Sequence, residues 1–240
     1  MSKVTTLASV AVLALAGAAN AVTINEVVMN DLSTDDYEFV ELCGHGETLN
    51  GLTLVVIEGE GTTAKGTIDV AIPLSGSISG YYVIGDAAVS PNVLQAANWI
   101  ENGGETVLLV SGFTGSVGQD IDANDDGLAD AVIGTIVDGI GVGMPSSSDV
   151  VYYGVPFLGP DTGDAGGSNF DVAGVVRCID CDGDWGMICL NGTEPTGSGC
   201  NTGNPFNPYF VAYASPGAAN LCPPVSVEPE TWGKMKAGYR

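Results

Sequence analysis

Hydrophobic residues along this chain gather in short runs that glycine, serine, asparagine and aspartate separate. Each run is rich in β-branched and aromatic residues and is too short for an ordinary helix, which is typical of β-strands. The chain has 35 glycines and 12 prolines, so long helices have little room. The predicted strands are Val22–Val28, Tyr37–Leu42, Leu52–Ile57, Tyr81–Ile84, Thr106–Val110, Val132–Val137 and Val150–Tyr153.

One short helix is expected, at Pro91–Asn98. Proline is favoured in the first turn of a helix, and Ser90 just before it would be the N-cap. Many short strands with frequent turns and almost no helix predict an all-β fold, either a β-sandwich or a barrel.

The first 21 residues have the three parts of a secretory signal peptide. Lys3 gives the basic start, Val10–Ala16 the apolar stretch, and Ala19-Asn20-Ala21 the small residues of a cleavage site. The apolar stretch is too short to span a bilayer. Val22 follows where a lipoprotein would have cysteine, so we expect a mature protein that begins near Val22 and is secreted or at the cell surface.

The charge balance is strongly acidic. Residues 22–230 carry Lys65 and Arg177 against 29 acidic residues, a net charge of −27. Such a surface repels phosphates, so nucleic acid is not expected as a partner. It fits a soluble extracellular protein, a halophilic setting or bound divalent cations. Hydrophobic residues make up 45% of the chain and charged residues only 15%, which indicates a folded core.

Six segments carry short motifs, which follow one another along the chain from I-N-E-V through F-V-E-L to a closing P-G-A-A-N. They are Ile24–Val28, Glu38–Leu42, Leu49–Leu54, Gly85–Asn92, Ile100–Leu109 and Ser215–Asn220. Together they resemble the lamin-tail domain of bacterial secreted proteins. The resemblance implies an immunoglobulin-like β-sandwich that is not catalytic and serves as a binding module beside enzymes or in surface proteins.

The resemblance has limits within the predicted domain, residues 22–224. Gly44 stands where the family's E-L-x-N motif has asparagine, and Thr53 stands where a tryptophan usually follows the turn. Residues 154–213 match poorly and are rich in cysteine, so we expect an insertion there.

The segment QDIDANDDGLAD, residues 119–130, has the pattern of a calcium loop. It contains D-x-N-x-D-G-x-x-D, the first nine positions of an EF-hand-type loop, with Gly127 at the sharp bend. The glutamate of position twelve is absent because Ile133 stands there, so Asp120 or a distant carboxylate would complete the shell. The candidate Ca²⁺ ligands are Asp120, Asp122, Asn124, Asp126, the Leu128 carbonyl and Asp130. The alternative is a solvated acidic turn.

A second acidic group, Asp180, Asp182 and Asp184 around Gly183, is a weaker metal candidate because it lacks the full loop spacing.

Six cysteines in an exported chain predict three disulfides. They are Cys43, Cys178, Cys181, Cys189, Cys200 and Cys222. Cys189 and Cys200 flank a short Gly/Pro/Ser loop and are the favoured pair, and Cys43 would tie the sandwich to the inserted segment. One alternative is a zinc site of Cys178, Cys181, Cys189 and Cys200, which export disfavours. A redox C-x-x-C is weaker still, because no thioredoxin-like pattern surrounds it.

No familiar catalytic motif is evident. The single histidine, His45, lies in a glycine turn and is expected to be an exposed loop residue. A carboxylate-based extracellular hydrolase such as a glycosidase is the alternative, because 29 acidic residues offer many pairs. We expect no enzyme but a calcium-stabilised, disulfide-bonded binding or structural module, with an extracellular protein or cell-surface component as partner.

Residues 225–240 form a short tail in which the charge changes from acidic to basic. Trp232, Met235 and Tyr239 fall on one face of a short helix. The tail resembles terminal segments of some exported bacterial proteins, which predicts a sorting or docking signal, and the alternative is a frayed terminus. It has too few apolar residues to span a membrane.

Overall fold

The computed structural model describes residues 21–29, 37–60, 65–101, 103–143, 149–158, 172–179, 181–189, 211–212 and 214–220. The predicted signal peptide and basic tail, together with Asp180, Cys200 and Cys222, lie outside the described residues. In the part that is described, no helix is long and apolar enough to cross a membrane.

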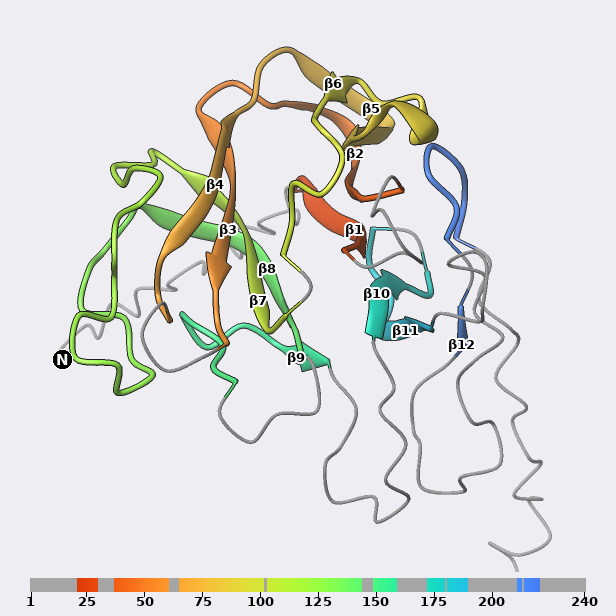
Figure 1. Ribbon diagram of the computed structural model, residues 1–240. Coiled ribbons are helices and arrows are strands. Elements are labelled where there is room, and N and C mark those ends of the chain that lie inside the picture. The colour runs from red at the N-terminus through yellow and green to blue at the C-terminus, as the bar shows by residue number, and fades with distance from the viewer. Residues whose placement is uncertain are drawn as a thin grey trace, which may run out of the picture.

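Strands in two sheets form the body of the protein, which confirms the all-β sandwich (Figure 1). The first sheet has the order β12-β11-β10-β1-β2-β5-β6. Its strands are β1 (Thr23–Val28), β2 (Phe39–Thr48), β5 (Ser77–Gly85), β6 (Val93–Leu94), β10 (Val172–Arg177), β11 (Trp185–Cys189) and β12 (Val211–Ala212). The second sheet has the order β4-β3-β7-β8-β9. Its strands are β3 (Leu52–Glu58), β4 (Ile68–Pro73), β7 (Glu105–Ser111), β8 (Thr135–Val142) and β9 (Phe157–Leu158).

The main core lies between the two sheets, where β1 contacts both β7 and β8. Alternate residues of each strand point to one face. From β3 and β7 the inward residues include Leu54, Val56, Val107 and Leu109, all essentially unexposed. Burying such side chains stabilises the fold by roughly 1.5–3 kcal/mol each.

The outer face of the second sheet is also covered. Val55 and Leu108 point outward from β3 and β7, and they pack with Ile121, Ile133 and Tyr152 from the connections around β8. The long β7–β8 connection, which contains the acidic segment, is therefore packed on the sheet and held by apolar contacts.

Five predicted strands match β1, β2, β3, β5 and β7, and two predictions need correction. The strand predicted at Val132–Val137 begins later, at Thr135. The strand predicted at Val150–Tyr153 does not form, because Tyr153 has a left-handed φ of 60° and Tyr152 instead inserts into the outer core. Periodicity also missed β4, β10 and β11.

The predicted helix at Pro91–Asn98 is wrong. Ser90 is not an N-cap but the left-handed C-cap of η1, a single 3-10 turn at Ala87–Val89. After it the chain adds β6 to the edge of β5, where the Asn92 side chain accepts a hydrogen bond from the Val83 amide at 2.8 Å. A side chain that caps a neighbouring strand competes with helix formation.

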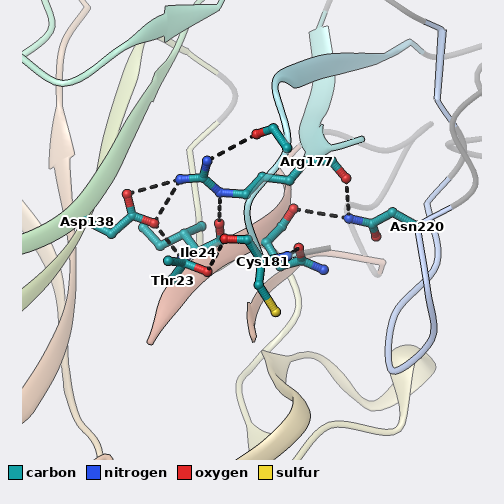
Figure 2. A network of polar contacts seen from close by, with 8 residues as sticks. Thr23, Ile24, Asp138, Arg177, Cys181 and Asn220 are labelled. Carbon is teal, nitrogen blue, oxygen red and sulfur yellow. Dashed lines mark hydrogen bonds and ion pairs between the residues drawn. The ribbon is translucent and has the colours of Figure 1, made fainter. Parts of the chain in front are cut away.

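Part of the segment expected as an insertion belongs to the first sheet. Strand β10 pairs antiparallel with β1, and β11 pairs with β10. Arg177 at the end of β10 crosses to the second sheet and binds Asp138 of β8 at 3.0 Å (Figure 2). Its Nε also donates to the Ile24 carbonyl at 2.8 Å, and its guanidinium stacks 4.3 Å from the Trp185 ring. One arginine thus links β1, β8, β10 and β11.

Candidate functional site

Buried polar residues of β1 and β2 hold the closing segment 214–220. Glu26 accepts hydrogen bonds from Ser215, and Glu41 accepts one from the Gly217 amide at 2.6 Å. The Asn25 side chain donates to Glu41 at 2.8 Å and accepts from the Cys181 amide at 3.0 Å. The motif segments at 24–28, 38–42 and 215–220 therefore contact one another. We call the polar residues of these three segments the polar frame.

Glu38, a further carboxylate of the polar frame, accepts hydrogen bonds from the connection between β6 and β7. Its Oε2 accepts from the Trp99 amide at 2.6 Å and from the Ile100 amide at 3.3 Å. The sequence showed acidic residues alternating with apolar ones at Glu38 and Glu41, yet both are fully buried. Amide donors from distant segments make this burial tolerable, because a buried carboxylate needs hydrogen-bond partners.

The disulfide prediction is confirmed where the structure describes it. Cys43 of β2 is bonded to Cys181, just before β11, so it ties the sandwich to the Cys-rich segment as expected. Cys178 is disulfide-bonded as well, so neither cysteine of the C-x-x-C offers a thiolate to zinc. The favoured Cys189–Cys200 pair involves a residue outside the described part and stays a prediction.

The acidic segment 119–130 lies in the β7–β8 connection and is fastened to the start of β4. Ile68 donates its amide to the Gln119 carbonyl, Ile121 donates to the Gly66 carbonyl, and Thr67 and Asp120 form an isolated bridge. Gly66 is required at this contact, since a Cβ there would lie 2.7 Å from the Asp122 Cβ. The position of the loop is fixed by the sheet.

Within this loop, Asp122 is the buried centre. Its Oδ1 accepts from the Asp126 amide at 3.1 Å, and its Oδ2 accepts from the Gly127 amide at 2.8 Å and the Tyr152 hydroxyl at 2.9 Å. Burial, followed by this hydrogen bond, raises the pKa of Tyr152, so the phenol stays a donor. Asp122 organises the loop from within.

The other candidate ligands curl around the same turn. The Asp120 Oδ1 accepts from the Asp122 amide, the Asn124 Oδ1 from the Asp126 amide, and the Asp126 Oδ1 from the Leu128 amide. All except Asp122 are exposed. The six predicted ligands thus lie on one loop, and their coordination of Ca²⁺ stays a prediction.

A second carboxylate group, which sequence reasoning missed, lies at the end of β3, β4 and β7. Among the described residues, Glu58, Asp69 and Glu101 have carboxyl oxygens within 4.8 Å of one another. Glu105 opens β7 directly opposite Glu58 in the strand register. We call these four residues the acidic cluster.

Burial and mutual repulsion change the ionisation of the acidic cluster. Burial, and then the neighbouring Glu101, raise the pKa of Glu58 to about 8 and that of Asp69 to about 6. Burial is also the main cause that raises the pKa of Glu105 well above its usual value, followed by repulsion from Glu58 and Asp69. The signal in the sequence was two acidic strand ends, E-G-E at 58–60 and E-N-G-G-E at 101–105. Their juxtaposition depends on the β3–β7 register, which no local pattern specifies.

The other candidate residues from the sequence, two aspartates and the histidine, belong neither to the loop at 119–130 nor to the acidic cluster. Asp182 and Asp184 of the weaker acidic group are both exposed. His45 is exposed as expected, but it lies in the outer part of β2 opposite Ser79 and not in a turn.

Comparison with known proteins gives no relative. No protein-family profile matches the chain, and neither the curated proteins nor the solved structures contain a significant match.

Proposed function

We propose that this protein is a secreted or cell-surface β-sandwich of the lamin-tail, immunoglobulin-like type that acts as a non-catalytic binding or structural module. The observation that carries the proposal is the polar frame. Asn25, Glu26 and Glu41 of the motif segments are buried and hold the closing segment: Glu41 accepts from Asn25 and from the Gly217 amide, and Glu26 accepts from Ser215. Asn220 in turn donates to the Arg177 carbonyl at 2.6 Å. Their contacts join distant segments of the fold, which is what a structural motif does.

Export is supported by the same region. The Cys43–Cys181 disulfide joins residues 138 positions apart beside the polar frame. Disulfides of this kind persist in oxidising compartments and are rare in the cytosol. This agrees with the signal-peptide pattern at residues 1–21 and with the acidic surface.

Calcium stabilisation of the loop at 119–130 is part of the proposal. The Asx-type hydrogen bonds of Asp122, Asn124 and Asp126 hold these side chains within one turn. A carbonyl or carboxylate oxygen that accepts one amide hydrogen bond keeps a second lone pair for a cation. Five aspartates in twelve residues repel one another without a counterion.

The alternative, a carboxylate-based hydrolase, has less support. Its two carboxyl groups must face the substrate on either side of the scissile bond. Glu58 is only 5% exposed and Glu105 is unexposed, so the acidic pair with the largest pKa shifts is turned away from a polysaccharide in solvent.

The calcium part is tested by thermal melts of the oxidised mature chain with Ca²⁺ and with a chelator. Calcium at about ten times the Kd of an extracellular module, Kd roughly 10⁻⁴–10⁻³ M, adds about 1.4 kcal/mol. For a domain of this size the midpoint rises by roughly 3–6 °C. The double variant Asp126→Asn/Asp130→Asn lacks two candidate ligands of the loop, so its midpoint should rise less with Ca²⁺ than that of the wild type. Asp125→Asn is the matched control and should rise as the wild type does. Asp125 is exposed and outside the ligand set, and its φ of 55° suits asparagine.

The module itself is tested with labelled mature protein and the cells that produce it. Saturable binding to the cell surface, together with no hydrolysis of a panel of polysaccharides, is the expected result. Turnover of any glycan that stops in Glu58→Gln would overturn the non-catalytic proposal.

A further inference from the structure

We propose that the acidic cluster, Glu58, Asp69, Glu101 and Glu105, is a second divalent-cation site that binds Ca²⁺ at the end of the second sheet. This site shares no ligand with the loop at 119–130, and the inference goes beyond the proposed function and does not depend on it.

The spacing of the oxygens suits one ion. Calcium takes six to eight oxygen ligands at about 2.3–2.6 Å, so two oxygens on opposite sides of the ion lie about 4.6–5.2 Å apart. One carboxyl oxygen from each of Glu58, Asp69 and Glu101 lies within 4.8 Å of the other two. Each can therefore contact the same cation, with ligands that come from β3, β4 and the turn before β7.

Glu105 provides an independent observation. Its side chain is unexposed, and both of its carboxyl oxygens are buried without any hydrogen-bond partner. It pairs with Glu58 across the strands, so its carboxylate lies beside the group. One buried oxygen of Asp69, Oδ2, also has no partner. A buried carboxylate is normally hydrogen-bonded, paired with a cation or bound to a metal.

Other acids surround the acidic cluster. Repulsion from Glu101 and Asp149 contributes to the raised pKa of Glu60, after burial. Glycines let these carboxylates approach the turn: a Cβ on Gly103 would lie 2.5 Å from the Glu60 carboxyl carbon. Among the described residues, the ion pair that forms within 4.0 Å is Arg177–Asp138, so no basic side chain there neutralises this group.

Hard oxygen ligands and a high negative charge specify the kind of ion. Carboxylates select Ca²⁺ and Mg²⁺ over metals that prefer nitrogen or sulfur. Mg²⁺ requires near-ideal octahedral geometry and keeps several of its waters. A partly buried group with four carboxylates from three different chain segments is better suited to the larger ion, which tolerates irregular geometry.

The experiment is isothermal titration of Ca²⁺ into the chelator-stripped, oxidised mature chain. Five proteins are compared: the wild type, Glu101→Gln, Glu105→Gln, the loop variant Asp126→Asn/Asp130→Asn, and the charge control Asp125→Asn. Glu101 is exposed, so its variant folds even if the buried substitution does not. We expect Glu101→Gln to weaken binding at this site at least about tenfold, since Ca²⁺ affinity follows the ligand charge count. Glu105→Gln should remove one bound ion, and Asp125→Asn should leave the titration unchanged.

The outcomes separate the two sites. A loop variant that keeps an ion, which Glu105→Gln or Glu101→Gln then loses, supports the acidic cluster whether or not the loop binds. Titrations of Glu101→Gln and Glu105→Gln that both match the wild type overturn the site, and so does a wild type that binds no calcium at millimolar concentration. If the loop variant alone loses an ion, the acidic cluster is excluded while the calcium loop stands.

Discussion

The polar frame and the acidic cluster both contain buried carboxylates, but these carboxylates differ in the hydrogen bonds that they accept. In the polar frame, Glu41 accepts hydrogen bonds from the Asn25 side chain and the Gly217 amide, and Glu26 accepts them from Ser215. In the acidic cluster, Glu105 is just as deeply buried and accepts none. Glu26, Glu41, Glu58 and Glu105 all lie at buried strand positions that an apolar residue would usually occupy.

The difference lies in which groups compensate the negative charge of the buried carboxylates. Amides from residues 215–217 reach Glu26 and Glu41 of the polar frame, so these two carboxylates receive their hydrogen bonds from the chain itself and contribute to the fold. In the acidic cluster, Glu58 accepts the Glu60 amide at 2.6 Å, whereas Glu105 has like charges as its neighbours and neither of its oxygens has a hydrogen-bond partner. A buried carboxyl group of this kind requires a proton or a cation.

The largest effect is expected when the polar frame loses its disulfide. Cys43→Ala/Cys181→Ala removes a cross-link over 138 residues, which should cost about 2–5 kcal/mol of unfolding free energy. Removing both cysteines avoids a mispaired thiol. Urea unfolding of the oxidised double variant measures the loss. A midpoint equal to that of the wild type would show that the cross-link does not contribute to the free energy of unfolding.

Removing one carboxylate of the polar frame should cost less but still destabilise. Glu41→Ala leaves the buried Asn25 amide without its acceptor and removes the hydrogen bond from the Gly217 N–H, which should cost about 3 kcal/mol. The midpoint of the thermal melt then falls by roughly 6–12 °C. Glu47→Ala, at a largely solvated position of β2, is the control and should shift the melt little. Equal melts for the two variants would contradict the structural role of Glu41.

The sequence singled out the segments that form the polar frame, but it predicted neither their contacts nor the acidic cluster. Strand periodicity located β1, β2, β3 and β7, and the ordered motifs identified the segments that meet at Asn25 and Glu41. It treated Glu38 and Glu41 only as acidic positions in an alternating strand, because a pattern of polar residues does not show which distant amide will cover them. Ser90 was predicted as an N-cap because serine is common there, whereas in the structure it takes the left-handed C-cap conformation of η1, where glycine or asparagine is more usual.

The acidic cluster escaped prediction because it depends on register. Glu58 and Glu105 are 47 positions apart and become neighbours only through the β3–β7 ladder. Asp69 joins them at an irregularity between Val56 and Ile57 in the β3–β4 pairing. A shift of one residue in either ladder would send these side chains to the other face. The candidate ligands of the loop at 119–130 are contiguous, so the sequence showed them as a pattern, whereas the acidic cluster is assembled from three segments.

In the acidic cluster, the same kind of substitution should have the opposite sign. The raised pKa of Glu105 means that its buried carboxyl group must take up a proton on folding at neutral pH, and Glu105→Gln removes this requirement. The new amide can also donate to the facing Glu58 carboxyl group. In chelator at neutral pH we expect this variant to be about 1 kcal/mol more stable than the wild type, measured by urea unfolding. Glu41→Gln in the polar frame should be destabilised under the same conditions. Destabilisation by Glu105→Gln to the extent of Glu41→Gln would mean that both groups are structural.

The last predicted effect is a dependence of stability on pH. Folding raises the pKa of Glu58 from 4.5 to about 8 and that of Asp69 from 3.8 to about 6, mainly through burial. Between its unfolded and folded pKa, each group binds more protons in the folded state, so stability falls as pH rises. In chelator, the wild type should therefore lose stability from about pH 5 to pH 8 more steeply than Glu58→Gln, at fixed ionic strength. Asp125→Asn, with the same charge change, controls for general repulsion in this acidic chain. Parallel slopes for the wild type and Glu58→Gln would show that Glu58 titrates as it does in the unfolded chain, and the contrast between the two carboxylate groups would then be one of hydrogen bonding alone.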